Sequence, residues 1–167
     1  LPALDVGKKL WKSTDINEWL KWESQYEATA SRILTGKLTY GPQTQKDKAK
    51  FGTDVHLKFN SIKSRLREAL SNNESLSLSL EELKDLRDWK MVRNRCRPSW
   101  LQLNVNFDDI VRSATEASFQ ILLSSKGKDW EGAFDSLTKD LFGVGPATAS
   151  IVFALVDESL PFYGEER

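Results

Sequence analysis

The chain has 167 residues, 40% of them hydrophobic and 29% charged, and its 24 Lys and Arg residues balance 24 Asp and Glu residues. This composition is typical of a globular protein with a sizeable core, and the zero net charge excludes nucleic-acid binding through overall basicity. One cysteine and one histidine exclude an internal disulfide, a Cys/His zinc site and a four-cysteine iron–sulfur cluster, so we expect no metal and no cofactor.

The first predicted element is an amphipathic helix that begins at Asp15 and ends at Gly36. Asp15 and Glu18 have the spacing of a capping box. Aromatic side chains follow at helical spacing, at Trp19, Trp22 and Tyr26. Such a stripe favours packing in a core or against a helix of a partner protein.

Residues 39–52 differ in composition from the segments on either side, because they are rich in Gly, Pro, Gln, Lys and Asp. Such a segment predicts a mobile surface loop. We therefore expect residues 1–52 to form a Trp-rich helix and a loop, packed on a main domain of residues 53–167.

Apolar residues at helical spacing predict further helices in the main domain. These stripes cover residues 55–70, 80–92, 110–122, 130–141 and 151–156. Two capping boxes mark helix starts, Ser79 with Glu82 and Asn106 with Asp109. Since no alternating run flanked by turns predicts a strand, we expect an all-α fold, a compact orthogonal helical bundle.

The stretch between the last two helices is the most informative, and it reads LFGVGPATAS (residues 141–150). Two glycines permit a tight reversal, Val144 between them points inward, and Pro146 suits the first turn of a new helix. The backbone N–H groups at Gly145 and the helix start then face outward, at the positive end of the helix dipole. This pattern predicts a helix-hairpin-helix that binds a DNA phosphate, and a plain turn is the alternative.

Residues 141–149 resemble the helix-hairpin-helix of the DNA glycosylase superfamily, whose pattern is Leu-x-Gly-(Val/Ile)-Gly-x-x-Thr-Ala. The chain also resembles a group of poorly characterised, mostly fungal glycosylase-like proteins. Residues 89–98 match their Trp-Lys-x-x-Arg-x-x-x-Arg-Pro segment, and residues 160–166 correspond to their Val-Pro-Phe-Phe-Ser-Asp-Glu segment. On these grounds we expect DNA contacts from Gly143, Val144, Gly145, Ala147 and Thr148.

The resemblance also implies where a catalytic carboxylate would lie. The aspartate of the glycosylases follows the first hairpin glycine by twenty-two residues, and Glu165 holds that position here. Glutamate is one methylene longer, and a solvated acidic tail is the alternative interpretation of Glu165. Ala147 replaces the lysine that forms a Schiff base in bifunctional members, so lyase activity by that route is not expected.

Five positive charges fall within eleven residues, at Arg87, Lys90, Arg93, Arg95 and Arg97. On a helix, Lys90, Arg93 and Arg97 share one face, and Arg87 extends that face backward. A basic face predicts contacts to phosphate, whereas the alternative is a solvated face balanced by acidic neighbours.

Three functions follow from these patterns. The first, which we favour, is a nuclear DNA-binding domain that grips the phosphate backbone independently of base sequence and has no chemistry of its own. The second is a base-excision N-glycosylase of DNA repair with Glu165 as the catalytic carboxylate. The third is a protein-interaction domain that docks a partner through Trp19 and Trp22.

The remaining expectations concern the surroundings of the chain. Its apolar runs fall far short of a membrane span, which predicts a soluble, intracellular protein with no membrane partner. Because the chain starts at Leu1 and stops at Arg167 without a terminating helix, we expect a fragment of a longer protein, truncated at its C-terminus.

Overall fold

The computed structural model describes residues 15–17, 20–21, 45–91, 98–157 and 160. From residue 45 onward it contains α4 (Gln45–Ser71), α5 (Leu80–Met91), the 3-10 helix η1 (Pro98–Val105), α6 (Asp108–Ser124), α7 (Trp130–Thr138) and α8 (Pro146–Val156). No β strand occurs within the described ranges, so the prediction of an all-α fold is confirmed for this part of the chain. None of the described helices is long and apolar enough to cross a lipid bilayer.

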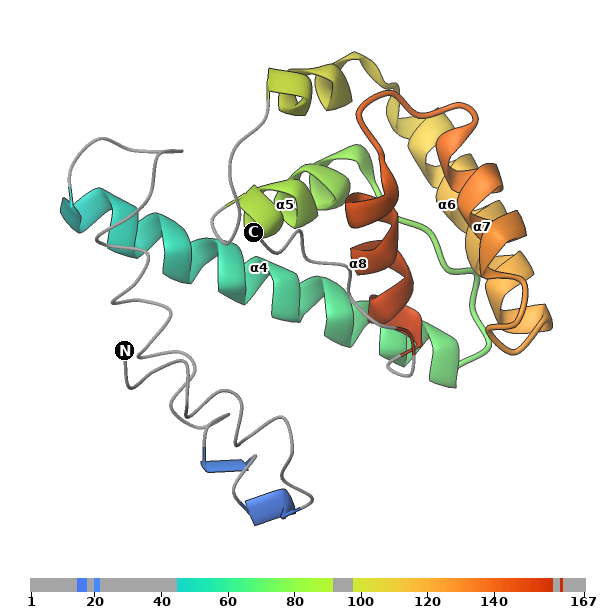
Figure 1. The fold of residues 1–167 in the computed structure, drawn as a ribbon, viewed down its shortest axis with the longest axis horizontal. Helices are drawn as coiled ribbons and strands as arrows, with labels where there is room; N and C mark the ends of the chain where they lie inside the picture. Colours follow the sequence, from blue (N-terminus) through green and yellow to red (C-terminus); the bar gives the residue numbers. More distant parts are fainter. Residues whose placement is uncertain (1–14, 18–19, 22–44, 92–97, 158–159, 161–167) are drawn as a thin grey trace.

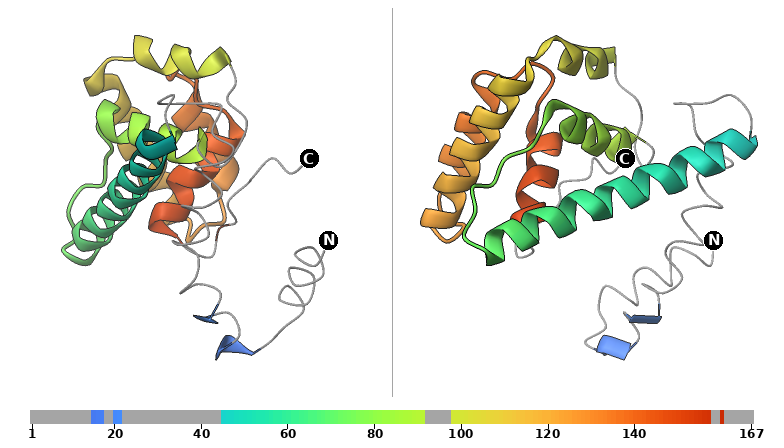
Figure 2. Two further views of the ribbon diagram at one scale, coloured as in Figure 1. Left: turned by 90° about the vertical axis from the view of Figure 1, so that its left-hand side faces the viewer. Right: turned by 180° about the vertical axis from the view of Figure 1, so that it is seen from behind.

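Helix α8 lies at the centre of the bundle. Figure 1 shows α4 and α5 as one pair, α6 and α7 as a second pair, and α8 between them, and the view from behind in Figure 2 agrees. Contacts join α8 to each of these four helices. The position follows from its sequence, PATASIVFALV, which has no charged side chain and buries residues on every side. The prediction of a buried helix over residues 151–156 is thereby confirmed.

Local signals set the junction between α4 and α5. Asn73 has a positive φ of 55°, and the next residue, Glu74, donates its N–H to the carbonyl oxygen of Ala69 at 2.9 Å, which ends α4. The capping box predicted at α5 is present in both directions, because Ser79 Oγ accepts from Glu82 N–H and Glu82 Oε2 accepts from Ser79 N–H.

Salt bridges then fasten α4 to α5. The guanidinium of Arg65 donates to both carboxylate oxygens of Glu82, at 2.7 and 2.9 Å, so the residue that caps α5 also holds α4. Lys58 pairs with Asp85 at 2.7 Å further along the same two helices. This hydrogen bond and ion pair raise the pKa of Lys58 above its ordinary value.

Helix α4 begins earlier than the sequence analysis predicts. Residues 45–52 belong to the helix and not to a mobile loop, and Gly52 is buried within it. Lys, Gln and Ala are good helix formers, so this segment extends the helix that the apolar stripe after it stabilises by packing. The domain boundary expected between residues 52 and 53 therefore falls inside α4.

The predicted N-terminal helix lies mostly outside the described residues. Residues 16–17 and 20–21 are helical, and Asp15 Oδ1 accepts a hydrogen bond from the N–H of Asn17 at 2.9 Å. The aromatic stripe of Trp19, Trp22 and Tyr26 is not among the described residues.

Asp108 joins the starts of α5 and α6. Its Oδ1 accepts from the backbone N–H of Leu80 at 2.7 Å, and its Oδ2 accepts from Arg112 Nε at 2.7 Å. The bond from Leu80, and then the bond from Arg112, hold the pKa of Asp108 below its ordinary value. A carboxyl group of this kind stabilises the folded state at neutral pH, and the contribution disappears as the pH falls through the lowered pKa.

We expect the Asp108→Asn variant to lose part of the acid sensitivity of the protein. Below about pH 4.5 the urea midpoint of the wild type should fall more steeply than that of Asp108→Asn, since the wild type gives up the charged interaction on protonation. The variant Asp109→Asn, which removes the neighbouring exposed carboxylate, should keep the wild-type slope. Identical slopes for wild type and Asp108→Asn would contradict the assignment.

Candidate functional site

The segment of greatest interest joins α7 to α8 and spans residues 139–145. Leu141 and Val144 are buried at its two ends, where they pack in the same core as Leu103 and Leu137. The prediction that Val144 points inward is confirmed. Between these two anchors, Phe142 and Gly143 are exposed.

The two glycines of this turn have different roles. Gly143 has a φ of +77°, and a Cβ atom there would lie 2.8 Å from the backbone nitrogen of Leu103, so only glycine fits. Gly145 is the N-cap of α8 with a φ of −114°, and no atom lies within 4 Å of the place a Cβ would take. Backbone geometry therefore requires glycine at 143 and not at 145, contrary to the expectation that both enable the reversal.

Within the described ranges, the backbone N–H groups of Asp140 and Leu141 have no acceptor, and neither do those of Gly143, Val144, Gly145 and Ala147, the four that lie at or near the start of α8. The N–H groups of Thr148 and Ala149, by contrast, donate to the carbonyl oxygen of Gly145 at 3.0 and 2.9 Å. Thr148 is also buried, so it closes the first turn of α8. The unbonded donors gather at the N-terminal end of α8, where the helix dipole is positive.

Asn106, between η1 and α6, holds this turn in place. Its Nδ2 donates to the carbonyl oxygens of Leu103 and Phe142, and its Oδ1 accepts from the N–H of Phe142, all at 2.9 Å. The side chain is only 7% exposed. Both polar groups of the Phe142 backbone are thereby bonded to one side chain, which fixes the residue that precedes Gly143.

The prediction that Asn106 caps α6 is wrong. The N-cap of α6 is Phe107, and no side chain caps it. Asn106 and Asp109 have the spacing of a capping box. However, the side-chain amide of Asn106 bonds backbone groups of η1 and of the turn and does not bond the start of α6. A buried carboxamide can accept a hydrogen bond from a peptide N–H and donate one to a peptide C=O at the same time. Because its partners lie far away in the sequence, no local pattern predicts these bonds.

The basic stretch is only partly within the described residues. Arg87 is 8% exposed; its Nε donates to Asp88 at 2.9 Å and its Nη1 to Asn104 at 3.3 Å. It is therefore a packed residue and does not extend a solvent-facing basic face as predicted. Lys90 is partly exposed in the last turn of α5, while Arg93, Arg95 and Arg97 lie outside the described ranges.

Aromatic and apolar residues of the same stretch serve the core. The ring of Trp89 stacks on Phe59 of α4 with the ring centroids 4.2 Å apart, and Met91 is buried. Trp89 therefore packs α5 against α4.

The surroundings of the turn are acidic overall. Residues 98–157 contain four Lys and Arg and eight Asp and Glu. Lys139, which follows α7, is exposed, and so is its neighbour Asp140. An anion at this turn would therefore depend on backbone N–H groups far more than on basic side chains.

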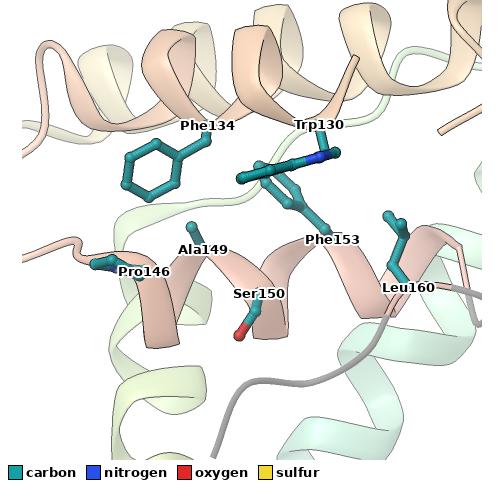
Figure 3. A pocket seen from close by; sticks show the side chains of 7 residues that line it. All are labelled: Trp130, Phe134, Pro146, Ala149, Ser150, Phe153 and Leu160. Atoms are coloured by element: carbon teal, nitrogen blue, oxygen red, sulfur yellow. The ribbon is translucent and has the colours of Figure 1, made fainter. Parts of the chain in front are cut away.

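An apolar groove of about 500 Å³ lies between α7 and α8, next to the turn. Figure 3 shows Trp130 and Phe134 pointing from α7 toward Ala149 and Phe153 of α8. Trp130 is 57% exposed although it begins a predicted apolar stripe. The spacing of Trp130 and Phe134 was visible in the sequence, whereas Phe153 joins them only through the packing of the two helices. Pro146, Ser150 and Leu160 complete the lining.

Comparisons with protein-family models, with curated protein sequences and with solved structures gave no match for this chain. Within the described residues, no three side chains of His, Cys, Asp or Glu gather in a way that could hold a metal ion. Glu165, the predicted position of a catalytic carboxylate, is not among the described residues.

The two glycines provide a matched pair for testing the turn. Gly143→Ala should lower the free energy of unfolding by at least about 2 kcal/mol, because the new side chain meets both a left-handed backbone and the backbone of Leu103. Gly145→Ala should change it by no more than about 0.5 kcal/mol, since the site is open. Equal losses in urea denaturation would contradict the geometry.

Removing the carboxamide of Asn106 should also destabilise the fold. Asn106→Ala leaves the N–H of Phe142 and two carbonyl oxygens without their partner, which we expect to cost about 1–3 kcal/mol in the free energy of unfolding. Asn60→Ala, on the exposed face of α4, serves as the control and should stay within about 0.5 kcal/mol of wild type. A loss for Asn106→Ala no larger than the control would show that the bonds do not matter.

Proposed function

We propose that the protein is a DNA-binding domain that holds the phosphate backbone, independently of base sequence, through the turn between α7 and α8. One observation carries the proposal: four N–H groups at Gly143, Val144, Gly145 and Ala147 have no acceptor in the described part of the chain. Open space outside Gly145 leaves room for a ligand.

The physical basis is that the donors are fixed before the ligand arrives. Asn106 and the close approach of Gly143 to Leu103 hold the backbone of the turn, so little conformational entropy remains to be lost on binding. Phosphate oxygens accept hydrogen bonds from N–H groups at a helix N-terminus and are stabilised by its dipole. Such contacts orient a nucleic acid without reading its bases.

Basic side chains would add to this contact. Lys139 is exposed at the C-terminal end of α7, directly before the turn. Lys90, Arg93 and Arg97 are proposed as further phosphate contacts on the grounds given by the sequence. Thr148 acts within the turn, since its N–H is bonded to Gly145.

The resemblance of residues 141–149 to the helix-hairpin-helix of DNA glycosylases supports DNA as the ligand and, with it, a nuclear location and a part in DNA repair. The proposal concerns binding and assigns no reaction. Ala147 stands at the position of the lyase lysine, and Glu165 is one methylene longer than the aspartate of the glycosylases.

The variant Gly145→Val tests the proposal because it adds a branched side chain in front of the unbonded N–H groups without disturbing the packed turn. We expect its affinity for a short DNA duplex at low salt, measured by fluorescence anisotropy, to be at least about tenfold lower than that of wild type.

The control is Gln120→Val, which places the same side chain on an exposed position of α6 and should leave DNA affinity unchanged. Thermal melting should show both variants folded. If Gly145→Val binds DNA as tightly as Gln120→Val does, the turn is not the phosphate site.

A further inference from the structure

A second surface feature lies between α6 and α7, beside the segment that carries the proposed DNA contact. It is a hollow of about 370 Å³ lined by Ile110, Ser113, Ala114, Ala117, Ser136 and Asp140. In the described part of the chain, the carboxylate of Asp140 and the hydroxyls of Ser113 and Ser136 have no hydrogen-bond or ion-pair partner. The hollow thus presents three oxygen-bearing side chains that the fold itself does not use.

The lining suits a side chain with an apolar stem and a cationic head. Ala114, Ala117 and Ile110 offer apolar walls, while the oxygen atoms of Asp140, Ser113 and Ser136 can accept hydrogen bonds. Lysine and arginine have this division, because their methylene groups pack on apolar surface while the charged group reaches polar atoms.

Exposed apolar side chains lie close in sequence to residues that line the hollow. Phe107, one helical turn before Ile110, is 74% exposed, and Phe142, two residues after Asp140, is 65% exposed. The bonds from Asn106 to the Phe142 backbone keep the segments that carry these two residues together. Exposed large apolar side chains are typical of surfaces that bind another protein.

The charges around the hollow decide what kind of partner fits. Within the described residues, Asp109 and Asp140 are exposed and Asp108 is paired with Arg112, which leaves Lys139 as a neighbouring cation outside that pair. The side chains of this surface therefore attract positive charge.

We propose that the hollow between α6 and α7 docks a basic polypeptide of a partner protein. An arginine or lysine side chain of that partner enters the hollow toward Asp140, and an adjacent aliphatic side chain packs on Phe107 and Phe142. The hollow offers side chains, whereas the proposed DNA contact uses backbone N–H groups, and the two lie next to each other because Asp140 and Phe142 belong to the same segment of residues 139–145.

The experiment uses the full chain, labelled with nitrogen-15, and the peptide acetyl-Leu-Arg-Leu-Arg-amide as the probe. On titration at low salt, we expect saturable shifts of the backbone amide resonances of Ser113, Ala117, Ser136 and Asp140. The peptide acetyl-Gly-Arg-Gly-Arg-amide, which lacks aliphatic side chains, should bind about tenfold more weakly because it makes no apolar contact. The acidic peptide acetyl-Leu-Glu-Leu-Glu-amide should cause no shift at these residues.

Two variants assign the charge. Asp140→Asn should weaken binding of the arginine peptide about threefold to fivefold, in keeping with an ion pair near the surface. Glu131→Gln, which removes one exposed carboxylate of α7 outside the hollow, should leave affinity unchanged. Ser136→Val fills the hollow without a change of charge and should weaken binding as well.

The outcomes separate the possibilities. Shifts that lie outside the hollow, or equal affinities for Asp140→Asn and Glu131→Gln, would overturn the proposal. Equal binding of the acidic peptide would also overturn it. So would displacement of the arginine peptide by spermine together with equal affinities for the peptides with and without leucine, because the site would then recognise a small cation. Shifts of the same residues by a DNA oligonucleotide in place of the peptide would also overturn it.

Discussion

Three hydrogen bonds from one buried carboxamide, that of Asn106, determine where the turn between α7 and α8 lies. They bond both polar groups of the Phe142 backbone and tie them to η1, and Gly143 then packs against the backbone of Leu103 so closely that no side chain fits. With the turn fixed by these contacts, Val144 packs in the core, and N–H groups without an acceptor in the described part of the chain lie at the start of α8. The proposed phosphate contact depends on this arrangement.

Local rules predicted the parts of the fold that depend on neighbours in the sequence. The capping box of Ser79 and Glu82 and the buried character of α8 both follow from short-range hydrogen bonding and apolar spacing. Glycine at position 143 belongs to the same class, since a positive φ in a tight turn nearly always selects glycine.

Tertiary contacts decided the features that the sequence misassigned. The sequence predicts Arg87 as part of a basic face, yet it is buried where α5 meets η1, beside Asp88 and Asn104. Asn106 has the spacing of a cap, but its amide meets a turn 36 residues away. The groove at Trp130 and the hollow at Asp140 are each lined by residues of two helices, so no single stretch of sequence predicts them. The result is a molecule whose proposed anion contact uses backbone donors while side-chain charge nearby favours cations.

The most direct test observes the unbonded N–H groups themselves. In proton–nitrogen correlation spectra of the labelled chain, addition of a short DNA duplex should move the amide protons of Gly143, Gly145 and Ala147 downfield, with a common saturation curve, as each gains a phosphate acceptor. Resonances of Thr148 and Ala149, whose N–H groups are already bonded to Gly145, should move less. If DNA shifts other regions of the spectrum and leaves those three amide protons unchanged, the turn does not hold phosphate and the account is wrong.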